Sequence, residues 1–177
     1  AEGALRLGWA VAMPSYTLAP EASIPEITHQ IGHAITEAAS RVAGPIRLTG
    51  HSAGGHLVTR MICENGPLAD EVSDRIERVI SISGLHDLRP LMLHSMNEKL
   101  GLNAETAATE SAALQTQLPG ISTTAWVGAA ERPEFLRQSA LFAEAWDVDL
   151  VADPKKHHFD VIDGLKDPNH PLCQAFA

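Results

Sequence analysis

Short apolar runs alternate with amphipathic stretches along this chain, the pattern typical of an α/β protein. Isoleucines at spacings of three and four residues predict a long helix near the start, because that period places them on one helical face. Continuous apolar runs such as 79–84 are typical of buried parallel strands. The pattern predicts helices over 24–42, 57–65, 134–146 and 161–176 (the last interrupted by Pro168), and strands over 9–13, 46–49, 79–84, 123–128 and 148–151. A mainly parallel sheet with helices on both faces follows.

Chain length, net charge and cysteine content limit the possible domain organisation and partners of such a fold. A chain of 177 residues suffices for one domain with a real core and is too short for two ordinary ones. The net charge of −9 argues against nucleic acid or an anionic membrane as partner. No apolar run approaches the roughly 20 residues that span a bilayer. Cys63 and Cys173 lie far apart without ligand spacing, which indicates free thiols in a reducing, cytoplasmic compartment.

The most informative stretch is Gly50-His51-Ser52-Ala53-Gly54-Gly55-His56, between a predicted strand and a predicted helix. In that setting G-x-S-x-G is a nucleophile elbow, a sharp turn that exposes a serine Oγ and needs small flanking residues. A chance match in a Gly/Ser-rich loop is the alternative reading. The N-terminus of the following helix offers backbone N–H groups to a developing oxyanion. Ser52 is therefore the candidate nucleophile, and the Ala53 N–H is the candidate oxyanion donor.

A serine nucleophile needs a base, and the base needs an orienting carboxylate. In the chain order Ser, acid, His, the acid follows a strand beyond the elbow and the His follows the last strand. Glu131 stands just after the strand predicted over 123–128. His157 and His158 both follow the last predicted strand, and spacing alone does not choose between them.

Several segments resemble the kynurenine formamidases (arylformamidases), a group within the esterase/lipase superfamily of α/β-hydrolases. The matching stretches are His158-Phe159-Asp160-Val161-Ile162, the elbow and Leu57, and residues 13–16, 84–91 and 131–139. The resemblance runs from about residue 8 to about residue 165. It implies Ser52 as the nucleophile, Glu131 in the acid position, and His158 rather than His157 as the base. The usual acid of the family is Asp, so Glu131 is one methylene longer.

The resemblance implies an activity as well. The expected reaction is hydrolysis of the formamide of N-formylkynurenine to kynurenine and formate, in tryptophan catabolism, without a metal or organic cofactor. Two alternatives stay open: a carboxylesterase acting on small acyl esters, which uses the same chemistry, and a non-catalytic fragment of a hydrolase. The expected partner is a small-molecule substrate, and a homodimer is the assembly under consideration.

One departure from the family concerns the oxyanion hole. The family carries a His-Gly-Gly segment after an early strand, and no such segment precedes Trp9. That strand is expected between the strands predicted over 9–13 and 46–49. The sequence therefore predicts a single, N-terminally incomplete α/β-hydrolase domain over 1–177 whose early strands are missing. Residues 91–118, read as helical pieces with loops, are expected to form a small cap.

Three further residues are candidates for substrate contact. Tyr16 lies in the loop after the first predicted strand, where a half-buried structural phenol is the alternative. His86 follows a strand at the edge where open α/β sheets bind ligands, and Asp87 beside it is read as a cap of the next turn. Asn97 lies in the expected cap.

The other histidines are assigned no chemistry. His51 and His56 are read as satisfied structural residues that point away from the nucleophile. His29 and His33 share a helical face without a third ligand, which favours a solvated face over a metal site.

Overall fold

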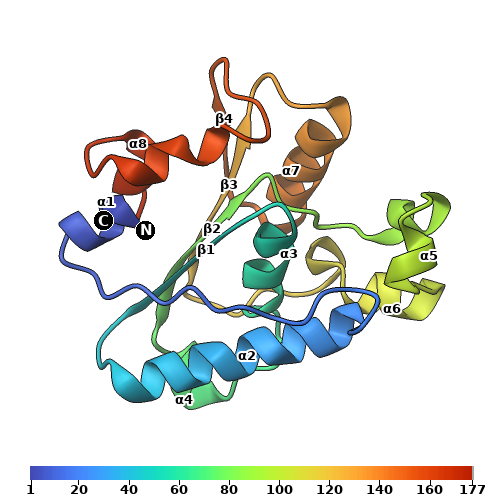
Figure 1. Ribbon diagram of the computed structural model, residues 1–177, viewed down its shortest axis with the longest axis horizontal. Helices are drawn as coiled ribbons and strands as arrows, with labels where there is room; N and C mark the ends of the chain where they lie inside the picture. The colour runs from blue at the N-terminus through green and yellow to red at the C-terminus, as the bar shows by residue number, and fades with distance from the viewer. Residues whose placement is uncertain (177) are drawn as a thin grey trace.

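The computed structural model describes residues 1–176, and its centre is one sheet of four parallel strands in the order β1-β2-β3-β4 (Figure 1). The strands are β1 (Ile46–His51), β2 (Ile76–Ile82), β3 (Ser122–Gly128) and β4 (Asp149–Asp153). The α-helices are α1 (Glu2–Arg6), α2 (Ile24–Arg41), α3 (Ala53–Arg60), α4 (Asp70–Ser73), α5 (Asn97–Leu100), α6 (Ala104–Thr109), α7 (Pro133–Trp146) and α8 (Pro171–Gln174). Short 3-10 helices are η1 (Arg89–Leu93), η2 (Ala112–Leu114) and η3 (Val161–Lys166). This is the predicted α/β architecture.

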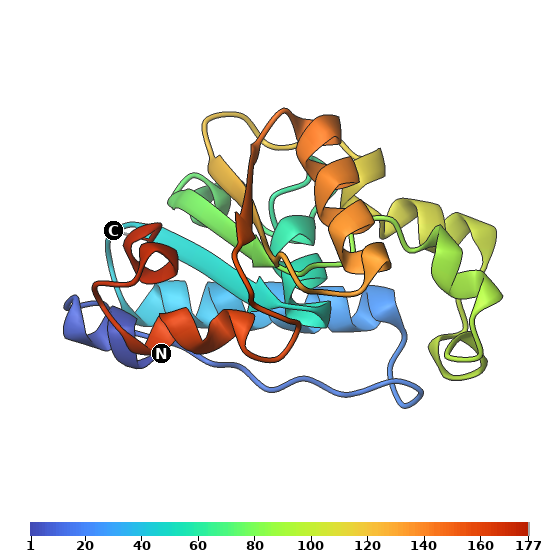
Figure 2. The ribbon, with the colours of Figure 1, turned by 90° about the horizontal axis from the view of Figure 1, so that it is seen from above.

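Helices cover both faces of the sheet because its central strands are apolar on both sides. On β2, Val79 packs into a cluster with Leu57 and Met61 of the α3 region. Ile80, one residue later, points to the opposite face and packs with Val161 of η3. In Figures 1 and 2, α2, α3 and α7 lie on one side of the sheet, and α1, η3 and α8 lie on the other. Each face therefore has its own core.

The helix predicted over 24–42 is confirmed as α2. A capping box fixes its start, because the Ser23 side chain accepts from the Glu26 N–H while the Glu26 carboxylate accepts from the Ser23 N–H at 2.7 Å. Ile27 and Ile31 bury the apolar stripe against the core. α7 matches the prediction over 134–146. The predicted interruption at Pro168 is found between η3 and α8.

The strand predicted over 9–13 is wrong. Residues 9–18 run without regular secondary structure and are mostly exposed, with Met13 79% accessible. A strand needs a neighbour to accept and donate its backbone hydrogen bonds, and no strand among residues 1–176 pairs with this segment. The Trp9 ring lies instead beneath the Arg47 guanidinium of β1, 4.2 Å from the ring centre.

Three smaller points concern the rest of the chain. The helix predicted over 57–65 begins earlier, at Ala53, and ends at Arg60.

Residues 91–118 form short helices that extend beyond α3 and α7 (Figure 1), and their role as a cap stays a prediction. None of the helices within 1–176 has the length and apolar character needed to cross a membrane.

Candidate active site

Ser52 sits at the turn between β1 and α3 in a conformation that few residues other than glycine adopt, with φ 56° and ψ −116°. The crossing of strand and helix explains two of the neighbouring glycines. A Cβ on Gly50 would overlap the carbonyl of Gly54, and a Cβ on Gly55 would lie 2.7 Å from Cα of Gly84. A Cβ on Gly54 would meet nothing within 4 Å. The sharp turn therefore depends on Gly50 and Gly55, while Gly54 faces open space.

Backbone contacts fix the turn against the sheet. The Ser52 N–H donates to the carbonyl of Ile82 at 2.9 Å, which extends the pairing of β1 with β2 by one residue. The Ala53 N–H belongs to the first turn of α3, where amides have no acceptor within their own helix. Ala53 is exposed, and the role of its amide as an oxyanion donor stays a prediction.

Glu131 and His158 meet across the ends of β3 and β4. Nδ1 of His158 lies 2.7 Å from Oε2 of Glu131, and the Glu131 side chain is completely inaccessible to solvent. The other carboxylate oxygen, Oε1, accepts from the Gly128 N–H at 3.0 Å and from the Ser83 hydroxyl. Three donors thus surround a buried carboxylate, which removes most of the cost of burying it.

The loops that carry the pair are joined by their backbones. The Ala129 N–H donates to the Asp153 carbonyl and the Ala130 N–H to the Lys156 carbonyl, both at 2.9 Å. A Cβ on Gly128 would overlap the carbonyl of Lys156, so the close approach of the two loops requires glycine there. This junction explains why Glu131 and His158 lie together.

Aromatic rings pack against the His158 imidazole. The Phe135 ring stacks on it with centroids 4.1 Å apart, and the His51 ring lies 4.5 Å away at 43°. His157 is exposed instead, and its Nε2 lies 3.5 Å from Asp160. Of the two histidines that spacing left open, only His158 contacts Glu131.

The candidate nucleophile and the candidate base are not hydrogen-bonded to each other. Within residues 1–176, Ser52 Oγ makes no hydrogen bond to His158, whereas His51, the residue before Ser52, contacts the His158 ring. Catalytic hydrogen bonds of this kind are often long in the absence of substrate and tighten when it binds.

The reading of His51 as a satisfied structural histidine is corrected. Its Nε2 is buried and has no hydrogen-bond partner among residues 1–176, and its ring faces His158. Burial, followed by the proximity of His158, lowers the pKa of His51, which favours the neutral imidazole. His56 does match that reading, since its Nε2 lies 2.7 Å from the Glu110 carbonyl oxygen.

His86 and Asn97, two of the residues expected to contact substrate, make contacts within the protein instead. His86 is completely buried, stacked on Phe142 at 3.8 Å, with its ring nitrogens beside the hydroxyls of Ser81 and Thr59. No surface of His86 is left for a substrate. The Asn97 amide bonds both the N–H and the carbonyl of Leu102, which closes its own loop.

The remaining residues follow the simpler reading. Tyr16 is half-buried and packs against the core cluster of α2 and α3. Asp87 accepts from both the backbone and the side chain of Arg89, as a cap does, and the Arg89 hydrogen bonds lower the pKa of this carboxyl. Within 1–176, no group of three or more His, Cys, Asp or Glu side chains is arranged to hold a metal ion.

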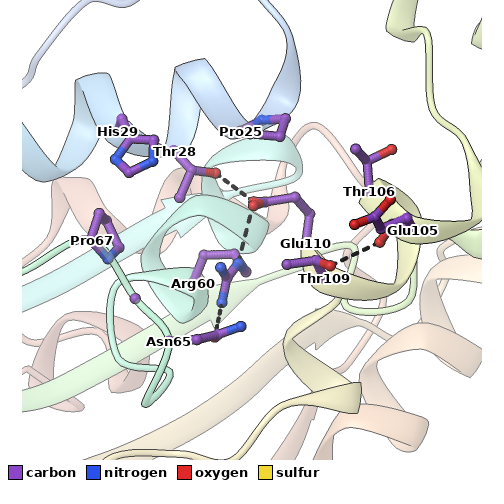
Figure 3. A pocket seen from close by; sticks show the side chains of 11 residues that line it. Pro25, Thr28, His29, Arg60, Asn65, Pro67, Glu105, Thr106, Thr109 and Glu110 are labelled. Atoms are coloured by element: carbon purple, nitrogen blue, oxygen red, sulfur yellow. Dashed lines mark hydrogen bonds and ion pairs between the residues drawn. The ribbon is translucent and has the colours of Figure 1, made fainter.

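A cavity of about 340 Å³ lies away from this site, between α2, α3 and α6 (Figure 3). Arg60 and Glu110 lie at its floor, bonded to each other and to Asn65 and Thr28. Neither Ser52, Glu131 nor His158 lines it.

Sequence reasoning missed Ser83, which directly follows β2 and contacts the candidate acid. The only local signal is a serine before a glycine at the end of a buried strand. Its partner lies 48 residues further along the chain, beyond the reach of any local pattern.

Comparison with known proteins agrees with the fold. A family model described as the alpha/beta hydrolase fold matches residues 1–146. The kynurenine formamidase of Danio rerio is 27% identical over 180 residues, covering 94% of this chain and 61% of that protein. That of Salmo salar is 28% identical over 181 residues, with the same coverage. This chain therefore spans about three fifths of the length of these relatives.

Solved structures give the same fold. A crystal structure described as a "putative thioesterase" from Silicibacter sp. TM1040 is 51% identical with a TM-score of 0.96, covering 99% of this chain and 66% of that one. Esterase 2 of Thermogutta terrifontis, 21% identical with a TM-score of 0.61, covers 78% of this chain and 56% of that one. The second likeness concerns the fold alone.

Proposed function

Because the chain belongs to the α/β-hydrolase fold family, we propose that it acts as a serine hydrolase with Ser52 as nucleophile, His158 as general base and Glu131 as the orienting acid. The contact of His158 Nδ1 with Glu131 Oε2, at 2.7 Å, carries the proposal. An ionised carboxylate only accepts hydrogen bonds, so Nδ1 holds the ring proton and Nε2 is left basic. That is the tautomer a serine nucleophile needs.

The chemistry follows from these positions. His158 Nε2 takes the Ser52 proton as Oγ attacks the carbonyl carbon, and the resulting oxyanion accepts from the Ala53 N–H. His158 then gives the proton to the departing amine, which leaves an acyl-serine. Water, deprotonated by His158, attacks this ester and releases the acid, and the proton returns to Ser52.

We propose the formamide of N-formylkynurenine as substrate, so that the products are kynurenine and formate. The resemblance of the elbow and of residues 131–139 and 158–162 supports this choice, as do the two kynurenine formamidases at 27% and 28% identity. A second candidate, hydrolysis of an ester or thioester, is supported by the 51% identical protein described as a "putative thioesterase". The triad chemistry is common to both, and the fold does not separate them.

The discriminating experiment compares kcat/KM for N-formylkynurenine, p-nitrophenyl acetate and an acyl thioester, with the Ser52→Ala variant as blank. A preference for the formamide is the expected result. An ester or thioester that is better by orders of magnitude would replace the proposed substrate. If a fluorophosphonate fails to label Ser52 in the folded chain, the hydrolase proposal itself is overturned in favour of a non-catalytic module.

A further inference from the structure

We infer that Ser83 is a positioning residue: its hydroxyl holds the Glu131 carboxylate in the orientation that lets the other carboxylate oxygen meet His158. The inference rests on the proposed triad. It starts from the position of Ser83 at the carboxyl end of β2, between the strand that leads to Ser52 and the strand that leads to Glu131. The residues that follow the four neighbouring strands β1 to β4 are therefore Ser52, Ser83, Glu131 and His158, in that order.

The backbone at Ser83 is as unusual as that at the nucleophile. Ser83 has φ 50° and Ser52 has φ 56°, and the two lie at equivalent places on adjacent strands. The Ser52 N–H donates to the Ile82 carbonyl, and the Ser83 N–H donates to the Trp126 carbonyl at 2.7 Å. Such a conformation is unfavourable for a residue other than glycine and is kept where the surroundings impose it. Glycine would fit this backbone better, so the presence of serine indicates that its side chain has a role.

The role of the side chain is a hydrogen bond to the candidate acid. Ser83 is completely buried, and its hydroxyl donates to Oε1 of Glu131. The Gly128 N–H donates to the same oxygen, so two donors from two different strands fix Oε1. With Oε1 fixed, rotation of the carboxylate is blocked and Oε2 is directed at His158 Nδ1. Within residues 1–176 the Ser83 hydroxyl makes no hydrogen bond to Ser52 or His158, so it acts through Glu131.

The geometry also depends on the length of the acidic side chain. Shortening Glu131 by one methylene withdraws the carboxylate from the Ser83 hydroxyl, because the Glu131 backbone is fixed by its own N–H bond to the Gly128 carbonyl. The contribution of Ser83 should therefore exist with glutamate at position 131 and disappear with aspartate. This coupling separates a positioning role from general support of the fold.

The test uses Ser83→Ala and Ser83→Gly in the full chain, with Ser81→Ala as the matched control. Ser81 lies on β2, two residues before Ser83, is equally buried, and bonds His86 rather than Glu131. We expect both Ser83 variants to slow fluorophosphonate labelling of Ser52 about 10- to 100-fold, the effect of losing one hydrogen bond to a charged group, and Ser81→Ala to stay within about twofold. Glycine at position 83 accepts the positive φ without strain, so its slower labelling cannot be assigned to a destabilised backbone.

The same change is then made in the Glu131→Asp background. We expect Ser83→Ala to alter the labelling rate there by less than about threefold, so that the two losses are not additive. Additive losses, or equal losses in Ser83→Ala and Ser81→Ala, would overturn the inference.

A readout independent of activity separates this inference from the proposed function. We expect the Nδ1–H proton of His158 to give a downfield NMR resonance in the wild-type chain and in Ser81→Ala, and to be lost or shifted upfield in both Ser83 variants. A missing wild-type resonance, or one that the Ser83 variants leave unchanged, overturns the positioning role. A wild-type chain that shows the resonance but is not labelled at Ser52 overturns the hydrolase proposal instead.

Discussion

Nδ1 of His158 lies 2.7 Å from Oε2 of Glu131, a contact between residues 27 positions apart that no local pattern specifies. The junction of the loops after β3 and β4 creates it, since the Ala130 N–H bonds the Lys156 carbonyl. The carboxylate is buried and the imidazole is partly exposed, with side-chain accessibilities of 0% and 19%. A charged acceptor is therefore paired with a ring that can still reach a bound substrate.

Replacement of Glu131 by glutamine tests this pair directly. The amide keeps the size of the side chain but removes the charge that stabilises a protonated His158, and it can present its NH₂ group to Nδ1 and so favour the wrong tautomer. We expect kcat/KM to fall by about 10³- to 10⁴-fold, measured with the preferred substrate. The thermal unfolding midpoint should stay above the assay temperature, so that unfolding cannot explain the loss of kcat/KM.

The control for this prediction is His157→Asn. The His157 side chain is 58% accessible and faces Asp160, so its replacement should leave kcat/KM within about twofold. If His157→Asn were as damaging as His158→Asn, the identification of His158 as the base would be wrong.

The elbow glycines allow a prediction about stability. A methyl group at Gly50 overlaps the Gly54 carbonyl, whereas a methyl group at Gly54 meets open space. We expect Gly50→Ala to destabilise the chain by several kcal/mol, about what a severe backbone clash costs, and Gly54→Ala to change stability by less than about 1 kcal/mol. Urea denaturation of both variants measures the difference, and equal stabilities would contradict the observed crossing of β1 and α3.

The sequence predicts most of the framework because its signals are local. The isoleucine period of α2 and the apolar runs of β2 and β3 each lie within one element, and the elbow motif needs only a strand before it and a helix after it. The chain order of an elbow, an acid and a histidine also directs attention to residues that the structure brings together.

What the sequence does not reveal depends on distant partners. Residues 9–13 are apolar enough for a strand, yet a strand forms only beside another one. His86 follows a strand as a ligand contact would, but the Gln138 side chain accepts from its backbone N–H at 2.9 Å and draws this loop onto α7. Ser83 carries no local mark of its contact with Glu131.

Acid should destabilise the fold through His86. Burial lowers the pKa of His86 to about 3, so the folded chain holds it neutral while the unfolded chain binds a proton below about pH 6.5. The stabilisation is fully present above pH 6.5 and is lost as the pH falls from there toward 3. Between pH 7.5 and 5.5 this single group should remove about 1.4 kcal/mol from the free energy of unfolding, as measured by urea denaturation.

The variant His86→Phe provides the comparison. A phenyl ring can keep the stacking on Phe142 and does not titrate, so the fall in stability between pH 7.5 and 5.5 should shrink by about 1.4 kcal/mol. Burial also lowers the pKa of His56, whose contribution remains in the variant and has the same sign. An unchanged pH dependence in His86→Phe would show that His86 is not the titrating group.

The last prediction concerns the buried ion pair between Arg60 and Glu110 (Figure 3). Nε of Arg60 lies 3.3 Å from Oε2 of Glu110, with side-chain accessibilities of 3% and 6%, and the Thr28 hydroxyl donates to the same carboxylate oxygen. Glu110→Gln leaves the guanidinium charge buried and unpaired, so we expect a loss of about 3–5 kcal/mol in the free energy of unfolding.

An exposed pair on α2 supplies the contrast for this experiment. Glu37 and Arg41 lie 2.6 Å apart with accessibilities of 63% and 75%, so Glu37→Gln makes the same chemical change where water solvates the remaining charge. Its cost should be at most about 0.5 kcal/mol. Similar losses in the two variants, measured by urea denaturation at pH 7.5, would mean that burial does not set the strength of the Arg60–Glu110 pair. The expected difference would instead show that this pair stabilises the packing of α6 against α2 and α3. Thr28 on α2 and Arg60 on α3 both donate to the carboxylate of Glu110, which follows α6.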